Sequence, residues 1–312
     1  MKTKQFSLKS LGIPYAFIPA AFFLGANILL NPHILSLRGI NILALQTVSI
    51  AFAVMAQTLV LIVRELDMSI GAMVSMTTVI VASTMGRFHL FSIVIALVAA
   101  AALGLFSGAI VAWVKIPGIV VTLAASMLIG GLALVIMPQP GGEVDELLGE
   151  LVNGQPLLIP NSLLLLILAL LIWNYVKNTR LGVSLFASGG NPFSAYASGL
   201  SVEQAKIAAY VGSGLLSALA GIIVAGKTMT GDATIGDPYT LNSITGTVLG
   251  GASFMGGIGT MRGALAGAVI IGVLVNILFF LGLSSHYQNI AEGLILLAAV
   301  LIWLSSNKER QS

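Results

Sequence analysis

A succession of long apolar segments constrains this chain more than any other feature. Bounded by charges, prolines or glycine clusters, they lie near residues 14–31, 42–63, 68–86, 91–114, 117–137, 161–176, 207–226, 241–256, 263–283 and 288–304. About 20 apolar residues cross a bilayer as a helix. Of the 312 residues 57% are hydrophobic and 8% charged, against about a quarter charged in a soluble domain. We therefore predict an all-α, polytopic transmembrane bundle of about ten spans, forming one domain over residues 1–312.

The positive charges test this topology, because Lys and Arg collect in cytoplasmic connections. Ten spans with a cytoplasmic N-terminus leave only Arg38, Arg87 and Lys227 outside. The inner side then holds Lys2, Lys4, Lys9, Arg64, Lys115, Lys177, Arg180, Lys206, Arg262, Lys308 and Arg310. This asymmetry favours the even number of spans and places both termini in the cytoplasm of a multi-pass membrane protein.

Two connections are long enough to hold structure of their own. The outer connection, 138–160, is acidic and has the pattern of a short amphipathic surface helix. In the inner connection, 177–206, Asn191 suits an N-cap, Pro192 suits the first helical position, and Gly199 suits the stop. This predicts a short helix over about 192–198. Such a helix either stabilises the loop by packing within it or serves as a rigid element that another protein binds and moves. These residues alone do not decide between the two.

Two glycine-rich breaks interrupt the apolar pattern five spans apart. Asp67, Ser69 and Gly71 open the third span, while a longer segment with Gly250, Gly251, Gly256 and Gly257 closes the eighth. Repeats with an odd number of spans insert in opposite directions, and paired breaks in such repeats are typical of transporters. We therefore predict inverted five-span repeats with hinges or a translocation path at the breaks. Close packing of helices through small residues is the alternative, and both can hold together.

Polar residues at membrane depth are candidates for contact with a solute, although many such groups join helix to helix. The uncharged candidates are Gln46, Thr47, Gln57, Ser69, Thr122, Asn242, Ser243, Thr245 and Asn276. Arg64, Glu65 and Asp67 are expected to mark a cytoplasmic turn in which Arg64 pairs with a carboxylate. Glu292, inside the last span, either faces a watery cavity or pairs with a neighbour.

Several kinds of chemistry are not expected of this chain. Cysteine is absent, and the three histidines do not have metal-ligand spacing. No Walker A sequence and no nucleophile–base–acid arrangement is present. We therefore expect no catalytic residue, no metal, no cofactor in this chain and no nucleic-acid partner. If ATP drives the protein, a separate subunit must hydrolyse it.

Three segments together resemble the permease subunits of bacterial ABC importers for ribose, xylose, galactose and autoinducer-2. Residues 67–71 are similar to the Asp-Leu-Ser-Val-Gly segment of that family. Residues 189–199 resemble its cytoplasmic loop, and residues 249–284 resemble its C-terminal signature. The chain departs from the family pattern at residues 64–66, where Gly-Gly-Ile is usual, and at residues 239–242, where Tyr-Glu-Leu-Asp is usual.

This resemblance implies a transporter subunit that forms the path for a sugar or sugar-like solute in the bacterial inner membrane. Its implied partners are a cytoplasmic ABC ATPase that binds ATP-Mg, a periplasmic solute-binding protein, a second permease subunit and the surrounding membrane lipid. The residues implied to dock on the ATPase are Asn191, Pro192, Ala195, Ser198 and Gly199. The alternatives are an ABC permease for nucleosides or branched-chain amino acids, or an ion-coupled secondary transporter.

Overall fold

The computed structural model describes residues 17–155 and 160–282, together with residues 287, 290, 293, 294 and 297. Within these residues every regular element is helical, apart from one isolated β-bridge between Gly141 and Gly231. A helix satisfies all its backbone hydrogen bonds internally, which hydrocarbon requires. Glu292 and most of the predicted tenth span lie outside the described residues.

Of the described helices, six are long and apolar enough to cross a membrane by themselves. They are α2 (Leu37–Ile62), α3 (Ile70–Phe88), α4 (Phe91–Ala109) with its π-helical continuation η3 (Ile110–Val114), α5 (Gly118–Ile136), α10 (Val202–Thr228) and α12 (Met261–Phe280). These helices coincide with the predicted second to fifth, seventh and ninth spans. The chain is a multi-pass membrane protein.

The remaining helices are shorter. The predicted first, sixth and eighth spans correspond to α1 (Phe17–Leu30), α7 (Asn161–Val176) and α11 (Asp237–Leu249). A bend of 80° joins α7 to α8 (Arg180–Gly190), and this pair makes a seventh crossing if it is one span. The other elements are η2 (Pro32–Leu35), α6 (Glu146–Asn153) and α9 (Pro192–Ala197). The count of ten spans therefore stays a prediction.

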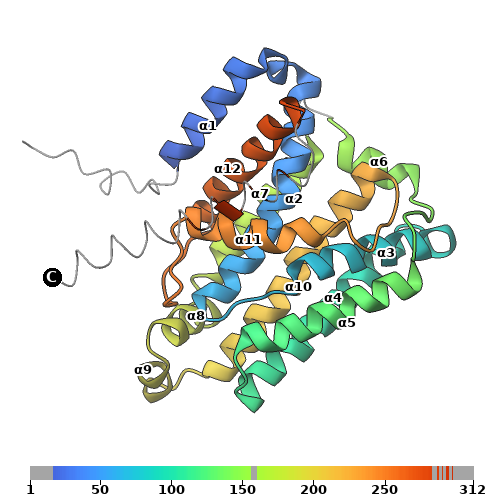
Figure 1. Cartoon of the computed structure of the whole chain (residues 1–312). Coiled ribbons are helices and arrows are strands. Elements are labelled where there is room, and N and C mark those ends of the chain that lie inside the picture. The colour runs from blue at the N-terminus through green and yellow to red at the C-terminus, as the bar shows by residue number, and fades with distance from the viewer. Residues whose placement is uncertain are drawn as a thin grey trace, which may run out of the picture.

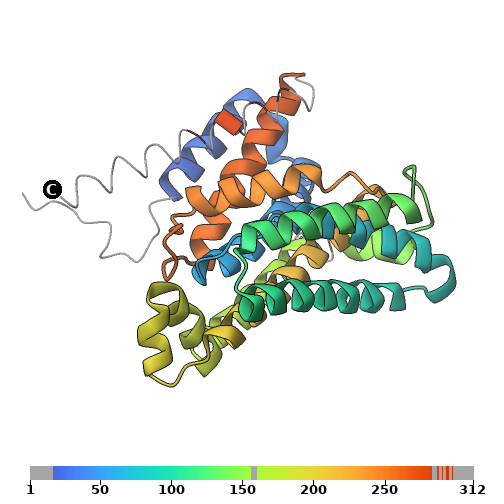
Figure 2. The same ribbon diagram turned by 60° about the horizontal axis from the view of Figure 1, so that its bottom comes forward.

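Two predicted connection helices are present in the structure. The acidic connection forms α6, which buries Leu148 and Val152 and exposes Glu146 and Glu150, as an amphipathic surface helix does, although Leu147 and Leu151 are exposed too. The connection 177–206 forms α9, with Asn191 as its N-cap and Pro192 as its first residue. Figure 2 shows α8 and α9 projecting together from one end of the helical bundle.

The bundle is built around α2, which is buried from Val48 to its end at Ile62. One side of α2 packs against α10, which also contacts α3 and α4, and another side packs against α11 and α12 (Figure 1). Gly104 of α4 allows close approach to the backbone of α10, because a Cβ atom there would lie 2.4 Å from the Tyr210 carbonyl oxygen. In contrast, α5 exposes Met127, Leu128 and Val135, as expected of a surface that faces lipid or another subunit.

Candidate functional site

The first predicted break, residues 67–71, lies where an irregular segment, residues 63–69, connects the end of α2 to the start of α3. Asp67 lies in this segment and is only 3% exposed. Its Oδ1 accepts hydrogen bonds from the Ser69 backbone N–H (2.8 Å) and hydroxyl (2.6 Å), and its Oδ2 accepts one from Ser213 of α10 (2.7 Å). Burial raises the pKa of the Asp67 carboxyl above its ordinary value, and the hydrogen bonds from Ser69 and Ser213 offset only part of this rise. Asp67 therefore joins the break to α10.

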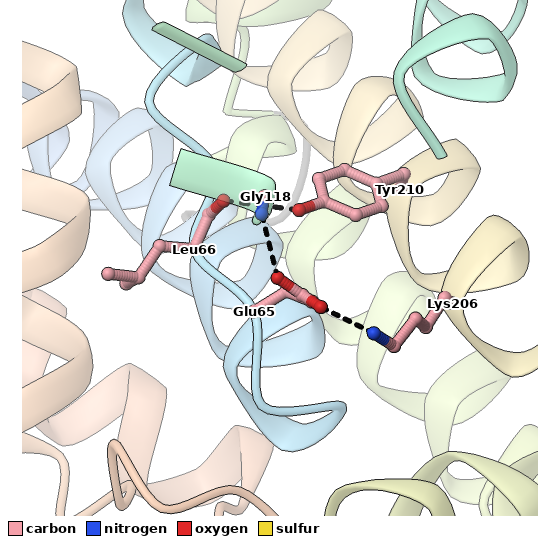
Figure 3. A network of polar contacts seen from close by, with 5 residues as sticks. All are labelled: Glu65, Leu66, Gly118, Lys206 and Tyr210. Carbon is pink, nitrogen blue, oxygen red and sulfur yellow. Dashed lines mark hydrogen bonds and ion pairs between the residues drawn. The ribbon is translucent and has the colours of Figure 1, made fainter. Parts of the chain in front are cut away.

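Glu65 makes a second connection from the same segment. Its Oε1 lies 2.5 Å from Lys206 Nζ at the start of α10, and its Oε2 accepts a hydrogen bond from the Gly118 N–H of α5 (2.9 Å), as Figure 3 shows. The neighbouring Leu66 carbonyl accepts a hydrogen bond from the Tyr210 hydroxyl (3.2 Å). The prediction that Arg64 supplies the cation was wrong, because Lys206 occupies that place and the Arg64 side chain is exposed.

Gly71 of the break lies against Gly236, which immediately precedes α11. The Gly71 N–H donates to Thr240 Oγ1 (3.1 Å), and the Gly236 N–H donates to Ser75 Oγ (2.9 Å). A Cβ atom on Gly71 would lie 2.5 Å from the Gly236 carbonyl oxygen, and one on Gly236 would lie 2.0 Å from the Gly71 carbonyl oxygen. The N-terminal ends of α3 and α11 therefore meet through reciprocal contacts that only glycine permits.

The segment that contains Gly236 repeats the sequence of the first break. Residues 67–71 read Asp-Met-Ser-Ile-Gly and residues 232–236 read Asp-Ala-Thr-Ile-Gly. Their local structures agree as well, because Asp232 Oδ1 accepts from the Thr234 N–H and hydroxyl, both at 2.8 Å. Sequence reasoning missed this segment, although the repeated Asp-x-Ser/Thr-Ile-Gly pattern was the signal. It paired the first break with residues 250–259 instead.

The glycines of the second break allow the chain to turn sharply after α11. Gly251, Gly256 and Gly257 have φ angles of +84°, +75° and +69°, a region that side chains rarely adopt. Gly250 packs on Gly263 of α12, because a Cβ atom on Gly250 would lie 2.5 Å from the Gly263 carbonyl oxygen. Close packing through small residues, the predicted alternative, therefore occurs beside the turn.

The second break also contacts the end of α2 and the end of α8. The Gly257 N–H donates to the Ile62 carbonyl (2.8 Å). A Cβ atom on Gly189 would lie 1.7 Å from the Ile62 carbonyl oxygen and 2.6 Å from Gly257 N, and one on Gly257 would lie 2.7 Å from the Gly190 Cα. We call this three-way contact of Ile62, Gly189 and Gly257 the glycine junction. It joins the second break and the predicted docking loop to the end of α2, five residues before the first break.

The predicted docking residues lie around α9. The Asn191 side chain accepts a hydrogen bond from the Ser194 N–H (3.0 Å), and Gly199 ends the turn with a φ of +72°. Ala195 is buried at 3%, whereas Asn191, Pro192, Ser198 and Gly199 are exposed. Sequence reasoning missed the largest apolar side chains of this surface, Phe193 and Tyr196, which are 81% and 71% exposed.

Two further candidates lie elsewhere. Asn242 is buried in α11, and its Oδ1 has no hydrogen-bond partner among the described residues. Asn276 of α12 accepts a hydrogen bond from the Asn27 side chain of α1 (3.2 Å), so it faces α1, whereas Gly263 of the same helix faces α11. The structure thus brings Asp67, Ser69 and Gly71 into contact with α10 and α11, and it leaves Asn276 on another face.

The comparisons with known proteins agree on one class. A family model described as branched-chain amino acid transport system / permease component matches residues 39–300. The ribose import permease protein RbsC of Escherichia coli (strain K12) is 34% identical over 281 residues, which cover 88% of each chain. The RbsC protein of Bacillus subtilis (strain 168) is 33% identical over 97% of this chain and 98% of its own. The galactose/methyl galactoside import permease protein MglC of Haemophilus influenzae is 29% identical over 96% of each chain. No solved structure matches.

Proposed function

Because this chain belongs to the family of branched-chain amino acid transport system permease components, we propose that it forms the path for a sugar or sugar-like solute across a bacterial inner membrane. The chain is a permease subunit of an ABC importer and not an enzyme. Although the family description mentions amino acids, the similar proteins are import permeases for ribose and galactose. This similarity, over nearly the whole chain, is the observation that carries the proposal of a sugar over a nucleoside or an amino acid.

The proposed assembly has four kinds of component. A second permease subunit completes the path, a periplasmic protein delivers the solute, and a cytoplasmic ATPase binds ATP-Mg and docks on α9. The exposed aromatic rings of Phe193 and Tyr196 support a docking role, because large apolar side chains at the tip of a projecting loop favour a protein partner. This chain supplies no nucleotide site of its own in the proposal.

We further propose ten spans in two inverted repeats, with both termini in the cytoplasm. Asp232, Gly236 and Thr240 follow Asp67, Gly71 and Ser75 by the same 165 positions. The starts of α2 and α10, at residues 37 and 202, differ by 165 positions too. The reciprocal hydrogen bonds of Gly71 and Gly236 are those expected around a local two-fold axis, as inverted repeats produce.

In this proposal the solute passes near the first break and α11. Buried polar atoms without partners support that placement, because such atoms are costly unless water or a solute satisfies them. Gln57 of α2 and Asn242 and Thr245 of α11 have such atoms within the described structure. Amides and hydroxyls exchange hydrogen bonds with sugar hydroxyls without carrying a charge into the membrane. Asp67, Ser69 and Gly71 act as a hinge beside this path.

The glycine junction gives the docking loop a route to both breaks. A push on α9 moves α8, whose Gly189 touches the carbonyl of Ile62 and the backbone of Gly257. The chain that follows α9 enters α10, whose Lys206 pairs with Glu65, two residues before the first break. Backbone-to-backbone contacts of this kind are stiff, because no flexible side chain absorbs the displacement.

Uptake by reconstituted vesicles tests the proposed function. Ribose uptake is expected to require the partner ATPase, ATP and the solute-binding protein together with this chain. The radiolabelled sugars ribose, xylose and galactose are compared with a nucleoside and leucine as alternative solutes. Uptake by this chain alone, driven by a proton or sodium gradient, would instead establish a secondary transporter.

A further inference from the structure

A groove of about 780 Å³ opens between η2, the first turns of α2, the end of α10 and the end of α12, away from the first break and α11. Its cationic side chains are Arg38, the second residue of α2, and Lys227, close to the end of α10. Since α2 and α10 have 26 and 27 residues, each is about 40 Å long at 1.5 Å per residue. This length places the ends of both helices at the head-group layer of a bilayer.

The cations of this groove are available to a ligand. Neither the Arg38 nor the Lys227 side chain makes a hydrogen bond or an ion pair with any residue of the described parts of the chain. The side chain of His33, which also lines the groove, is exposed as well. Two unpaired positive charges close to a polar histidine attract an anion, and a guanidinium group binds phosphate oxygens with two parallel hydrogen bonds.

The groove also has large apolar side chains in its wall. Ile42, Phe279 and Phe280 line it and are 48%, 75% and 51% exposed. A soluble phosphate ion would gain no binding energy from these apolar side chains, and the exposure of this much apolar surface to water is unfavourable. A molecule with an anionic head and apolar chains matches both parts of the groove at once.

We propose that this groove binds a phospholipid with an anionic head group, with its phosphate on Arg38 and Lys227 and its acyl chains along Ile42, Phe279 and Phe280. The bound lipid covers the gap between η2 and the ends of α10 and α12.

Lipid retention by the purified full-length chain tests this proposal. Native mass spectrometry in detergent compares phosphatidylglycerol with phosphatidylcholine at equal concentrations, for the wild type and for the double variant Arg38→Gln/Lys227→Gln. We expect the wild type to bind phosphatidylglycerol at least about tenfold more tightly, since about 1.4 kcal/mol suffices for that ratio. The double variant is expected to lose this preference.

Two controls separate the groove from general attraction of the lipid to positive charge. Arg87→Gln/Lys115→Gln removes the same charge elsewhere and is expected to retain the preference, as is the charge-conserving variant Arg38→Lys/Lys227→Arg. Equal loss in the Arg87/Lys115 variant, or no preference in the wild type, overturns the proposal. So does displacement of the lipid by inorganic phosphate or by an acidic peptide at micromolar concentration, which identifies a soluble anion as the ligand.

Discussion

A single methyl group on Gly189 tests whether the glycine junction transmits movement from the docking loop to the breaks. In Gly189→Ala the new Cβ atom would lie 1.7 Å from the Ile62 carbonyl oxygen and 2.6 Å from Gly257 N. Real Cβ atoms essentially never approach another atom within 3.0 Å, so α8 and the end of α2 must separate by more than about 1 Å. Both neighbours are backbone atoms, and no side chain can rotate away. Overpacking of this kind costs about 1–3 kcal/mol.

Gly190→Ala is the matched control for this substitution. Gly190 is the next residue of the same helix, and a Cβ atom there would have no neighbour within 4 Å. Both variants gain the same helix propensity, at most about 1 kcal/mol. The free energy of unfolding in detergent is therefore expected to fall for Gly189→Ala and to stay level or rise for Gly190→Ala.

Transport by the two alanine variants separates coupling from stability. In vesicles that contain the complete importer, Gly189→Ala is expected to lower the number of solute molecules taken up per ATP hydrolysed, because the added methyl group breaks the contact of α8 with Ile62 and Gly257. Gly190→Ala is expected to keep the wild-type ratio. If the two variants have equal stability and equal ratios, the glycine junction does not carry the movement and the reasoning from its geometry fails.

Two further predictions concern the first break. The Lys206 and Glu65 side chains are 23% and 13% exposed. The free energy of breaking this pair is therefore expected to lie between that of an exposed pair, about 0–1 kcal/mol, and that of a fully buried pair, about 3–5 kcal/mol. Glu65→Gln and Lys206→Met are each expected to lose about 2 kcal/mol of unfolding free energy, and the double variant less than the sum, so additive losses would contradict the pairing. Ser213→Ala removes a hydrogen bond to the Asp67 carboxylate and is expected to lose about 1.5–3 kcal/mol. Ser217→Ala is its control, because the Ser217 hydroxyl has no partner within the described structure; thermal unfolding that fails to separate the two serine variants would contradict the assigned bond.

Local signals in the sequence, namely the length of an apolar segment and the residues that cap a helix, predicted most of the helices. Apolar length located α2 to α5, α10 and α12, and the N-cap Asn191 with Pro192 located α9 to within one residue. These features succeed because capping and apolar length act over one or a few turns of helix. The predicted eighth span, 241–256, overlaps α11, which begins four residues earlier and forms only 13 residues of helix. Its length is set by the turns on both sides.

The contacts of the site depend on tertiary structure and were not predictable in the same way. Lys206 lies 141 positions from Glu65, and nothing local to either residue favours it over Arg64, the adjacent cation. The close approach of Gly189 to Ile62 likewise depends on how α8 returns toward α2. The repeated pattern at residues 232–236 was visible in the sequence, but its meaning came from the reciprocal contact of Gly71 and Gly236.

The central claim, that α9 carries the stroke of the ATPase into the membrane, is tested most directly by Ala195→Pro in the reconstituted importer. The Ala195 N–H donates to the Asn191 carbonyl (3.0 Å), and proline removes that donor and disrupts the helix. Ala195→Ser keeps the donor and serves as the control. Measured together, ATP hydrolysis is expected to continue in Ala195→Pro while solute uptake is lost and the protein stays inserted in the membrane. Uptake at the wild-type rate per ATP hydrolysed would contradict the account.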